Sequence, residues 1–357
     1  MEWPWRGGTP PLSNEMTKIP LEPVDAVTVT TLVENVYDIF MPDQRPAYRS
    51  GPGSTKGRLG TATMLNGSVP DQLVAEHGFS VLLEVQRQGR THRLVFDLGA
   101  SPDGMVENMR RLDLDPKDVE AIVCSHGHFD HTAGLDGLAR YLGRAKLPVI
   151  IHPDFWNRRR ALFPGRDPVE LPTTSRSALE GVGFTVIEER QPSFLLDGSV
   201  LVSGEVPRVT GYEPGFPFQE AWRSDHWEPD PLVLDDQAIV LNVRDQGLVV
   251  ITGCGHAGVV NITRYARVLT GQDRVCAIIG GFHLNGPVFE PLIDRVCADL
   301  LEMSPSWIVP GHCTGWRAQH AMGRVFGESF VPNCVGTRLV LGAAGEEAAA
   351  RGYDASA

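Results

Sequence analysis

Three histidines and one aspartate stand within six positions of one short segment of the chain. Segment 124–131 reads Cys-Ser-His-Gly-His-Phe-Asp-His, so the four residues are His126, His128, Asp130 and His131. Imidazole nitrogens and carboxylate oxygens are ligands that zinc and similar divalent ions prefer. In extended backbone, alternate side chains lie on one side, which places His126 beside His128. Where the chain turns, Asp130 and His131 can point back to the same cavity. The segment therefore predicts a metal site, with a solvated polar turn as the alternative.

The spacing His-x-His-x-Asp-His resembles the signature of the metallo-β-lactamase superfamily. Residues 94–99 resemble the strand of that superfamily that ends in Asp-x-Gly. Its aspartate, Asp97 here, lies behind the metal ligands in family members. The resemblance covers about residues 25–342. Later segments, at 75–79, 253–256, 281–283 and 310–315, resemble one branch, the dihydropterin-linked ribofuranosylaminobenzene phosphate synthase-like metallohydrolases.

Four ligands from one segment cannot saturate two ions, so later residues must contribute. We choose His256 and His312, each in a glycine-rich turn just past a predicted strand. His283 is a rival for either role, or a substrate contact. The resemblance implies two ligand sets, His126 with His128 and His256 for one ion, and Asp130 with His131 and His312 for the other. Each ion then keeps an open position, as catalytic zinc does.

The chain departs from the superfamily pattern at Cys254. Much of the superfamily has a bridging aspartate where this chain reads Gly253-Cys254. The bridge is then absent or replaced by a thiolate, which would weaken the second ion or favour a metal other than zinc. A small buried residue is the other interpretation of Cys254.

Residues 253–258 also match the dinucleotide-binding pattern Gly-x-Gly-x-x-Gly, after a predicted strand and before a predicted helix. The acidic residue expected at the end of the next strand is absent, because Gly280-Gly281 stands there, and this disfavours a nicotinamide cofactor. The amides at the start of such a helix can still bind a phosphate or carboxylate of a substrate.

These features predict a metal-dependent hydrolase with two divalent ions, zinc first, with manganese or iron as alternatives. Water bound to such an ion has its pKa lowered toward ~7 and becomes hydroxide that attacks a carbonyl or phosphoryl centre. Asp130 is expected to orient that water or take its proton, and Asp97 to fix a ligand imidazole. His77, just before a predicted strand, is a candidate substrate contact. The expected substrate is a small organic molecule, phosphorylated or pterin-like.

Two other functions stay open on the sequence. One is an iron-dependent redox enzyme, since the resemblance includes oxygen-handling relatives with the same fold and ligands. The other is a non-catalytic metal-containing binding or sensor protein, which the missing bridge favours. Metal analysis, and turnover of esters, lactones or phosphodiesters, would distinguish them.

Composition narrows the partners and the compartment. The net charge of −12 disfavours binding to nucleic acid. The run Arg158-Arg159-Arg160 is a candidate for a local basic patch, but we predict that it is a solvated helix face. No apolar run is long enough to span a bilayer, and the first residues lack the apolar core of a signal peptide. Six scattered cysteines without a Cys-x-x-Cys pair predict a reduced, cytoplasmic protein. We expect a small-molecule substrate and no nucleic-acid or membrane partner, while the oligomeric state stays open.

The elements that position these residues follow from hydrophobic periodicity. The first half predicts strands at 27–33, 79–85, 92–98, 121–124 and 149–151, with helices at 102–112 and 135–142. The second half predicts strands at 237–243, 247–251, 275–279 and 307–309, closed by 338–341, with helices at 259–269, 288–301 and 316–326. Two strand-rich halves with outer helices predict an α/β fold, an αββα sandwich.

One domain is expected over residues 23–342, between a flexible N-terminal arm, 1–22, and a C-terminal tail, 343–357. Residues 153–230 break the rhythm with prolines and aromatic residues. We interpret them as an insertion that walls a pocket, whose aromatic side chains either line that pocket or pack a satellite core.

Overall fold

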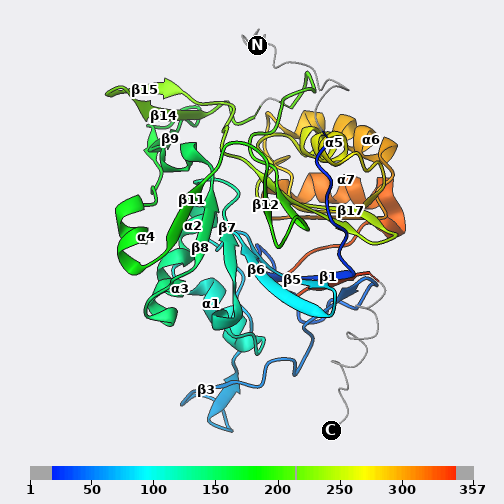
Figure 1. Cartoon of the computed structure of the whole chain (residues 1–357). Helices are drawn as coiled ribbons and strands as arrows, with labels where there is room; N and C mark the ends of the chain where they lie inside the picture. Colours follow the sequence, from blue (N-terminus) through cyan, green and yellow to red (C-terminus); the bar gives the residue numbers. More distant parts are fainter. Residues whose placement is uncertain (1–17, 214, 343–357) are drawn as a thin grey trace.

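Two β-sheets lie face to face, and helices cover their outer faces (Figure 1). The computed structural model describes residues 18–213 and 215–342. The predicted tail and residues 1–17 of the predicted arm lie outside this range. Within it, the amide of Ile19 donates to the carbonyl of Leu269 at 2.7 Å, and Leu21 is buried, so the chain is already packed on the domain here.

The first sheet combines the N-terminal strands with the last strand of the chain. Its strands lie in the order β11 (Thr185–Glu188), β8 (Pro148–Ile151), β7 (Ala121–Val123), β6 (Arg90–Phe96), β5 (Ser80–Arg87), β1 (Ala26–Val33), β20 (Arg338–Leu341) and β2 (Ala47–Tyr48). Its outer helices are α1 (Gly104–Arg111), α3 (Gly134–Leu142) and α4 (Arg176–Val182), while the short α2 (Phe129–Thr132) lies in the turn between β7 and α3.

The second sheet is built from the later part of the chain. Its strands lie in the order β12 (Ser193–Leu195), β13 (Val200–Val202), β16 (Ala238–Val243), β17 (Gly247–Thr252), β18 (Val275–Gly281) and β19 (Trp307–Gly311). Its outer helices are α5 (Val259–Thr270), α6 (Ile293–Glu302) and α7 (Trp316–Phe326).

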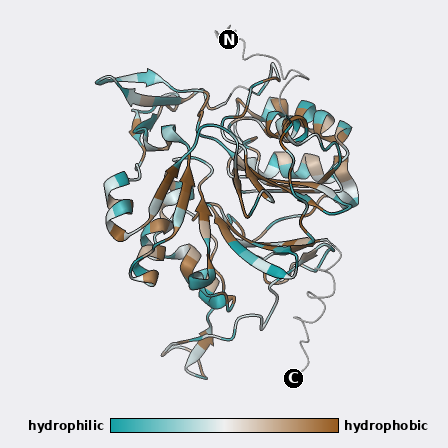
Figure 2. Ribbon diagram, viewed as in Figure 1, coloured by the Kyte–Doolittle hydropathy of each residue, from teal (hydrophilic) through white to brown (hydrophobic). Residues whose placement is uncertain are grey.

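Alternation along the strands explains the layers. Leu83 of β5 and Val249 of β17 belong to the core shared by the two sheets. Their neighbours Leu82 and Val250 point the other way, toward helices of the first and second sheet respectively. Figure 2 shows the result as hydrophobic colour concentrated on the strands of both sheets. The predicted αββα sandwich is confirmed.

Two predicted elements are corrected by the structure. β20 does not close the second half, because it pairs antiparallel with β1 and β2 in the first sheet. Periodicity identifies a strand but not its partner, which here lies at the other end of the chain. The helix predicted from Val288 begins only at Ile293, after a short 3₁₀ segment that contains Pro291. Proline disfavours the helical conformation in the residue before it.

The arginine run is also different from its prediction. Arg159–Ala161 is strand β9, so neighbouring side chains point to opposite sides. Arg158 and Arg160 pair with Glu170 and Glu220 on the accessible side. Arg159 points inward and is only 2% exposed. The run is therefore neither a helix face nor a basic patch.

Two smaller sheets complete the described structure. One has the order β10 (Val169–Glu170), β9, β14 (Gln219–Arg223) and β15 (His226–Pro229), and lies at the upper left of Figure 1. The other pairs β3 (Arg58–Gly60) with β4 (Ser68–Pro70) in a hairpin that projects from the body. No helix in the described ranges is long and apolar enough to cross a membrane.

Candidate metal centre

The candidate ligands follow the carboxyl ends of parallel strands, which lie together at one edge of a sheet. Strands β6 and β7 are parallel neighbours in the first sheet, as are β17, β18 and β19 in the second. The residues that follow these ends are Asp97 after β6, segment 124–131 after β7, Cys254 and His256 after β17, His283 after β18, and His312 after β19. The packing of the two sheets brings these turns together.

The first group is formed by His126, His128 and His256, whose ligand atoms lie within 4.8 Å of one another. His126 Nε2 and His128 Nδ1 are 2.9 Å apart, and the His256 ring centroid is 4.8 Å from that of His126. Burial, together with neighbouring His131, holds the pKa of His126 well below its ordinary value. Burial likewise lowers the pKa of His128 to about 4. Neutral imidazole is the form that binds a metal.

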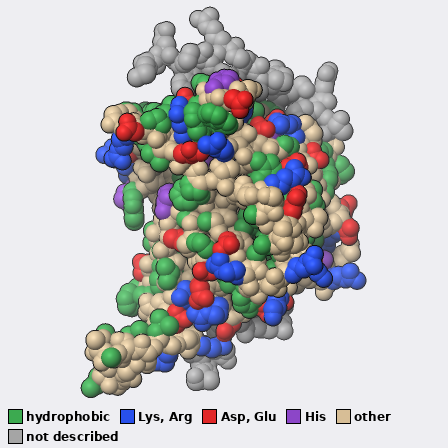
Figure 3. Space-filling view, turned by 90° about the vertical axis from the view of Figure 1, so that its left-hand side faces the viewer, with side chains coloured by type: hydrophobic (Ala, Val, Ile, Leu, Met, Phe, Trp, Pro, Cys, Tyr) green, Lys and Arg blue, Asp and Glu red, His purple; other side chains and the backbone are tan. Residues whose placement is uncertain are grey.

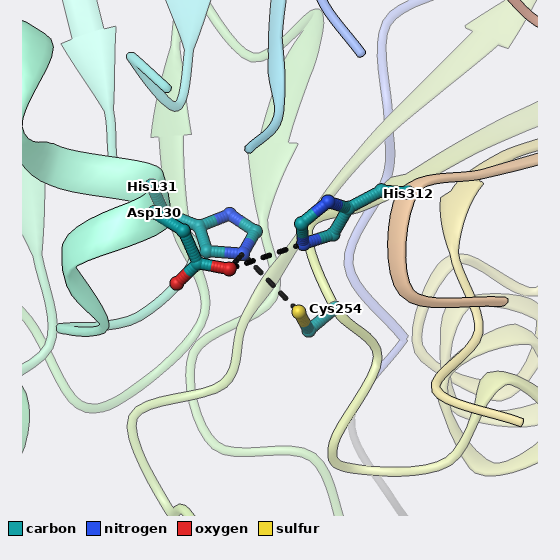
Figure 4. Close-up of side chains that lie close together, drawn as sticks. All are labelled: Asp130, His131, Cys254 and His312. Atoms are coloured by element: carbon teal, nitrogen blue, oxygen red, sulfur yellow. Dashed lines mark hydrogen bonds and ion pairs between the residues drawn. The ribbon is translucent and has the colours of Figure 1, made fainter. Parts of the chain in front are cut away.

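The second group is formed by Asp130 and His131 of α2 with Cys254 and His312, and the four side chains point toward one another (Figure 4). Asp130 Oδ2 lies 3.4 Å from His312 Nε2 and 3.7 Å from His131 Nε2. Cys254 Sγ lies 3.1 Å from His131 Nε2. Although burial alone would raise the pKa of Asp130, the charges of His131 and His312 lower it below its usual range. Asp130 is therefore a carboxylate.

Asp97 lies behind both groups and fixes the ring protons. This fully buried carboxylate accepts hydrogen bonds from Ser125 Oγ at 2.7 Å and from His131 Nδ1 at 2.6 Å. A carboxylate only accepts, so His131 carries a proton on Nδ1, and in the neutral ring, which is the form that binds a metal, its Nε2 is bare. Because the hydroxyl of Ser125 donates to Asp97, it accepts from His126 Nδ1 at 2.8 Å. The Nε2 atom of His126 is then bare as well.

The glycine at position 253 allows this close approach. A Cβ atom there would lie 2.1 Å from Ser125 Oγ and 2.6 Å from Asp97 Oδ2. The turn after β17 can therefore pass directly over the Asp97–Ser125 pair and carry Cys254 and His256 into the centre.

His312 is fixed by the loop after β1. Its amide donates to Glu34 Oε1 at 2.7 Å, and its carbonyl accepts from Asn35 Nδ2 at 3.0 Å. Because the amide nitrogen of Asn35 is used in this way, its oxygen faces His312 Nδ1, at 3.4 Å. The ring proton of His312 is thus placed on Nδ1, and Nε2 points toward Asp130.

Several buried nitrogens in the two groups lack hydrogen-bond partners among the described residues. They are His312 Nε2 and both ring nitrogens of His256. Burying such atoms without a partner costs free energy, and a metal ion would supply the partner. Burial lowers the pKa of His131, but Asp97 and Asp130 outweigh it and raise that pKa to about 9. This part of the site thus favours a positive charge, and the residues present fit divalent cations.

Cys254, His283 and His77 take three different positions. Cys254 belongs to the second group and also to a third, with His256 and His283. His283 packs on His256 at 4.4 Å between ring centroids, and its Nδ1 is buried without a hydrogen bond. His77 lies farther out, with Nε2 3.9 Å from Asp130 Oδ2 and its side chain 69% exposed.

The start of α5 is not free for a substrate phosphate, contrary to the sequence expectation. The buried carboxylate of Glu213 accepts hydrogen bonds from the amides of Val260 and Asn261, at 2.9 and 3.0 Å. A Cβ atom on Gly258 would lie 2.3 Å from that carboxylate. The helix amides are therefore already paired with an internal carboxyl group, which the sequence pattern does not reveal.

A cavity of about 500 Å³ lies beside the centre. Its lining includes His77, His283 and His312, as well as Phe163, Phe216, Phe218, Phe289 and Trp316. Other aromatic residues of 153–230 lie elsewhere: Phe155 is in the core, and Trp222 and Trp227 pack edge-to-face beside Arg158. Some aromatic residues of this region thus line the pocket and others pack away from it, so both interpretations given from the sequence apply.

Two side chains next to the centre were not singled out from the sequence. Gln219 Oε1 lies 2.5 Å from His128 Nε2, and the thiol of Cys313 donates to the carbonyl of Cys254 at 3.4 Å. A glutamine in an irregular region has no distinctive spacing. Cys313 could have been found from its position next to His312.

Comparisons with known proteins agree with this architecture. The model of the metallo-β-lactamase superfamily matches residues 74–270. A 7,8-dihydropterin-6-methyl-4-(β-D-ribofuranosyl)-aminobenzene-5′-phosphate synthase of Methanocaldococcus jannaschii is 30% identical over 260 residues, which are 72% of this chain and 87% of the relative. An uncharacterized protein of the same organism is 29% identical over 271 residues, 73% of this chain and 92% of the relative.

Among solved structures, a metal-dependent hydrolase of the β-lactamase superfamily superposes with a TM-score of 0.65. It is 23% identical, and the match covers 88% of this chain and 98% of that one, so the likeness is one of fold. The sandwich and its groups of histidine, aspartate and cysteine define a metal-binding α/β protein. The chain belongs to the metallo-β-lactamase superfamily. The relative at 30% identity also confirms the resemblance to the dihydropterin-linked branch.

Proposed function

We propose that the chain is a hydrolase that holds two divalent metal ions and acts on a small organic substrate. The observation that carries the proposal is the meeting of two ligand groups, from both sheets, beside a cavity. Such ions, when bound, supply a water of lowered pKa and polarise a carbonyl or phosphoryl oxygen. The first group would hold one ion and the second group the other.

Asp130 is the residue we assign to proton transfer. Its side chain is 14% exposed, and it lies between His77 on one side and His131 and His312 on the other. Because its pKa is lowered, it is ionised at neutral pH and can orient a water by accepting a hydrogen bond from it. Ions bound in the two groups would lower the pKa of such a water, and Asp130 would then be placed to take its proton. His77, on the open side, is placed to contact a substrate.

The cavity indicates the kind of substrate. Its aromatic side chains suit a planar, apolar body, and the amides of Asn285 and Gln319 offer hydrogen bonds to it. No lysine or arginine is among the described residues that line the cavity. We therefore propose that an uncharged planar group, such as a pterin-like ring, is recognised here rather than a phosphate. The name of the synthase relative supports a pterin-like compound.

The decisive experiment measures hydrolysis and metal content together. Zinc-, manganese- and iron-loaded protein is assayed against lactones, esters and phosphodiesters that carry a planar ring. Asp130→Asn is expected to abolish turnover and to leave the far-ultraviolet circular dichroism unchanged. Full activity in Asp130→Asn would refute the assigned role.

Metal stoichiometry tests the ligand groups separately. His256→Ala and His312→Ala should each lower the bound metal by about one ion per chain. His226→Ala is the matched control, because His226 lies on β15 with its side chain 62% exposed, outside the three groups. Unchanged stoichiometry in the first two variants would show that these ligands are misassigned.

The two alternative functions make different predictions for the same preparations. An iron-dependent redox enzyme would be coloured, would require iron and would consume oxygen. A binding or sensor protein would retain metal and turn over none of the substrates. The position of Cys254 in the second group weakens the case for a sensor, because a thiol is available where the aspartate bridge is missing.

A further inference from the structure

His128 is contacted from behind by a residue of the small sheet. Its Nε2 atom lies 2.5 Å from Oε1 of Gln219, which is on β14 and 1% exposed. The other ring nitrogen, Nδ1, faces His126 Nε2 at 2.9 Å. The ring therefore has one nitrogen directed to the scaffold and one to the first group.

The orientation of the Gln219 amide is decided by Asp230. Gln219 Nε2 donates to Asp230 Oδ2 at 3.0 Å, and a carboxylate can only accept. The amide oxygen must then face His128, and because this oxygen also only accepts, His128 carries its proton on Nε2. Its Nδ1 atom is bare.

Two bare nitrogens therefore face each other across the first group. His126 Nε2 is bare because its Nδ1 proton is given to Ser125, and His128 Nδ1 is bare because its Nε2 proton is given to Gln219. Two lone pairs at 2.9 Å repel each other unless a cation lies between them. This hydrogen-bond pattern selects metal binding over a hydrogen bond between the rings.

Buried Arg159 supports the arrangement from both sides. Its Nε donates to Asp230 Oδ2 at 3.3 Å, and its NH1 donates to Asp235 Oδ2 at 3.0 Å. Asp235 Oδ2 in turn accepts from the amide of Gly127, between the two histidines, at 2.8 Å. The guanidinium of Arg159 thus holds the backbone of Gly127 through Asp235. It also holds the side chain of His128 through Asp230 and Gln219.

We propose that Gln219 is a positioning residue for the metal centre. It holds His128 in the tautomer whose Nδ1 is the ligand atom, and Arg159 with Asp230 holds Gln219. The inference rests on the proposed metal site, and it gives the small sheet of β9, β10, β14 and β15 a function in that site.

Nuclear magnetic resonance of ¹⁵N-histidine-labelled, zinc-loaded protein tests the tautomer directly. Long-range ¹H–¹⁵N correlation is expected to place the proton of His128 on Nε2, and the protons of His126 and His131 on Nδ1. Gln219→Met keeps the length of the side chain and removes the acceptor. In this variant the His128 proton should exchange faster with water, and the zinc Kd of the first group should rise about 10- to 100-fold.

Glu220→Gln is the control, because Glu220 is the next residue of β14 and pairs with Arg160. It should leave proton exchange and zinc affinity as in the wild type. A His128 proton on Nδ1 in the wild type would overturn the inference, as would wild-type exchange and affinity in Gln219→Met. If the tautomers are as expected and no substrate is hydrolysed, the hydrolase proposal fails and the role of Gln219 stands.

Discussion

Asp97 is expected to control both metal ions, and replacing it by asparagine tests this. Its carboxylate accepts from the amide of Ser125 at 2.6 Å, from the Ser125 hydroxyl and from His131 Nδ1. Asparagine has nearly the same shape and tolerates the left-handed backbone of this position, where φ is 58°. The change therefore alters hydrogen-bond polarity with little effect on packing.

The backbone amide of Ser125 forces the orientation of the new side chain. The oxygen of the introduced asparagine must face that amide, which places its NH₂ group toward the Ser125 hydroxyl and His131 Nδ1. His131 must then accept on Nδ1 and carry its proton on Nε2, and Ser125 must donate to His126, which becomes protonated on Nε2. Both ligand nitrogens are blocked. Loss of such supporting contacts typically costs 10- to 100-fold in metal affinity, about 1.4–2.7 kcal/mol for each ion.

Competition with a chromophoric chelator measures the two Kd values, and thermal unfolding confirms that the variant is folded. Asp97→Asn should weaken both ions. Ser125→Ala is the matched control, because it removes the path to His126 and leaves the contact between Asp97 and His131, so it should weaken one ion only. Wild-type affinity for either ion in Asp97→Asn, or equal losses in the two variants, would refute this reasoning.

Three other substitutions test single contacts. Cys254→Ser should remove the near-ultraviolet thiolate-to-metal absorption of cobalt-loaded protein, and an unchanged band would place the thiolate elsewhere. Burial raises the pKa of Glu213 from its ordinary 4.5 to about 7. The contribution of Glu213 to the free energy of unfolding is therefore greatest below pH 4.5, and it falls by about 3 kcal/mol as the pH rises through 7. The free energy of unfolding of Glu213→Gln, measured in urea at several pH values, should lack this fall. The same pH dependence in the variant as in the wild type would contradict the prediction. Gly127→Ala brings Cβ to 2.2 Å from the Phe155 carbonyl oxygen and should cost about 1–3 kcal/mol by thermal unfolding, whereas an unchanged Tm would contradict so close an approach.

The sequence predicts those parts of the fold that depend on local patterns. Strands such as 80–87 and helices such as 316–326 follow from periodicity, and segment 124–131 is specific because its ligands are neighbours in the chain. His256 and His312 could be chosen because each lies in a glycine-rich turn just past a predicted strand. The choice succeeds because these strands are parallel in the structure, so their carboxyl ends lie at one edge of the sheet. The structure brings both into the predicted ligand groups.

Long-range partnerships could not be predicted in this way. The alternation of side chains in β20 would fit an edge of either sheet, so the local sequence does not indicate that β20 pairs with β1. Arg159 was predicted to be solvated, because its two carboxylate partners, Asp230 and Asp235, are more than 70 positions away in the sequence. Glu213 comes from a loop that is distant in sequence, and its carboxyl group pairs with the amides at the start of α5. The glycine pattern at 253–258 fits an anion site, but it does not show that a side chain of the same chain fills that site.

The absence of a nucleic-acid partner was expected from the net charge of the chain. On the face seen in Figure 3, Lys and Arg side chains are interspersed with Asp and Glu side chains. A nucleic-acid backbone would require a continuous basic stripe. That expectation stays a prediction, which a salt-dependent RNA-binding assay would test.

The metal groups also connect the activity to the stability of the sandwich. Segment 124–131 follows a strand of the first sheet, whereas Cys254, His256 and His312 follow strands of the second. Neither sheet alone supplies all the residues of the first group or of the second group. An ion held between them binds only the chain in which the sheets are packed, so its binding free energy adds to the stability of that packing, by about 2.7 kcal/mol when free metal is 100 times its Kd. Residues that orient the ligands, such as Asp97, therefore affect stability through the metal as well as through their own hydrogen bonds.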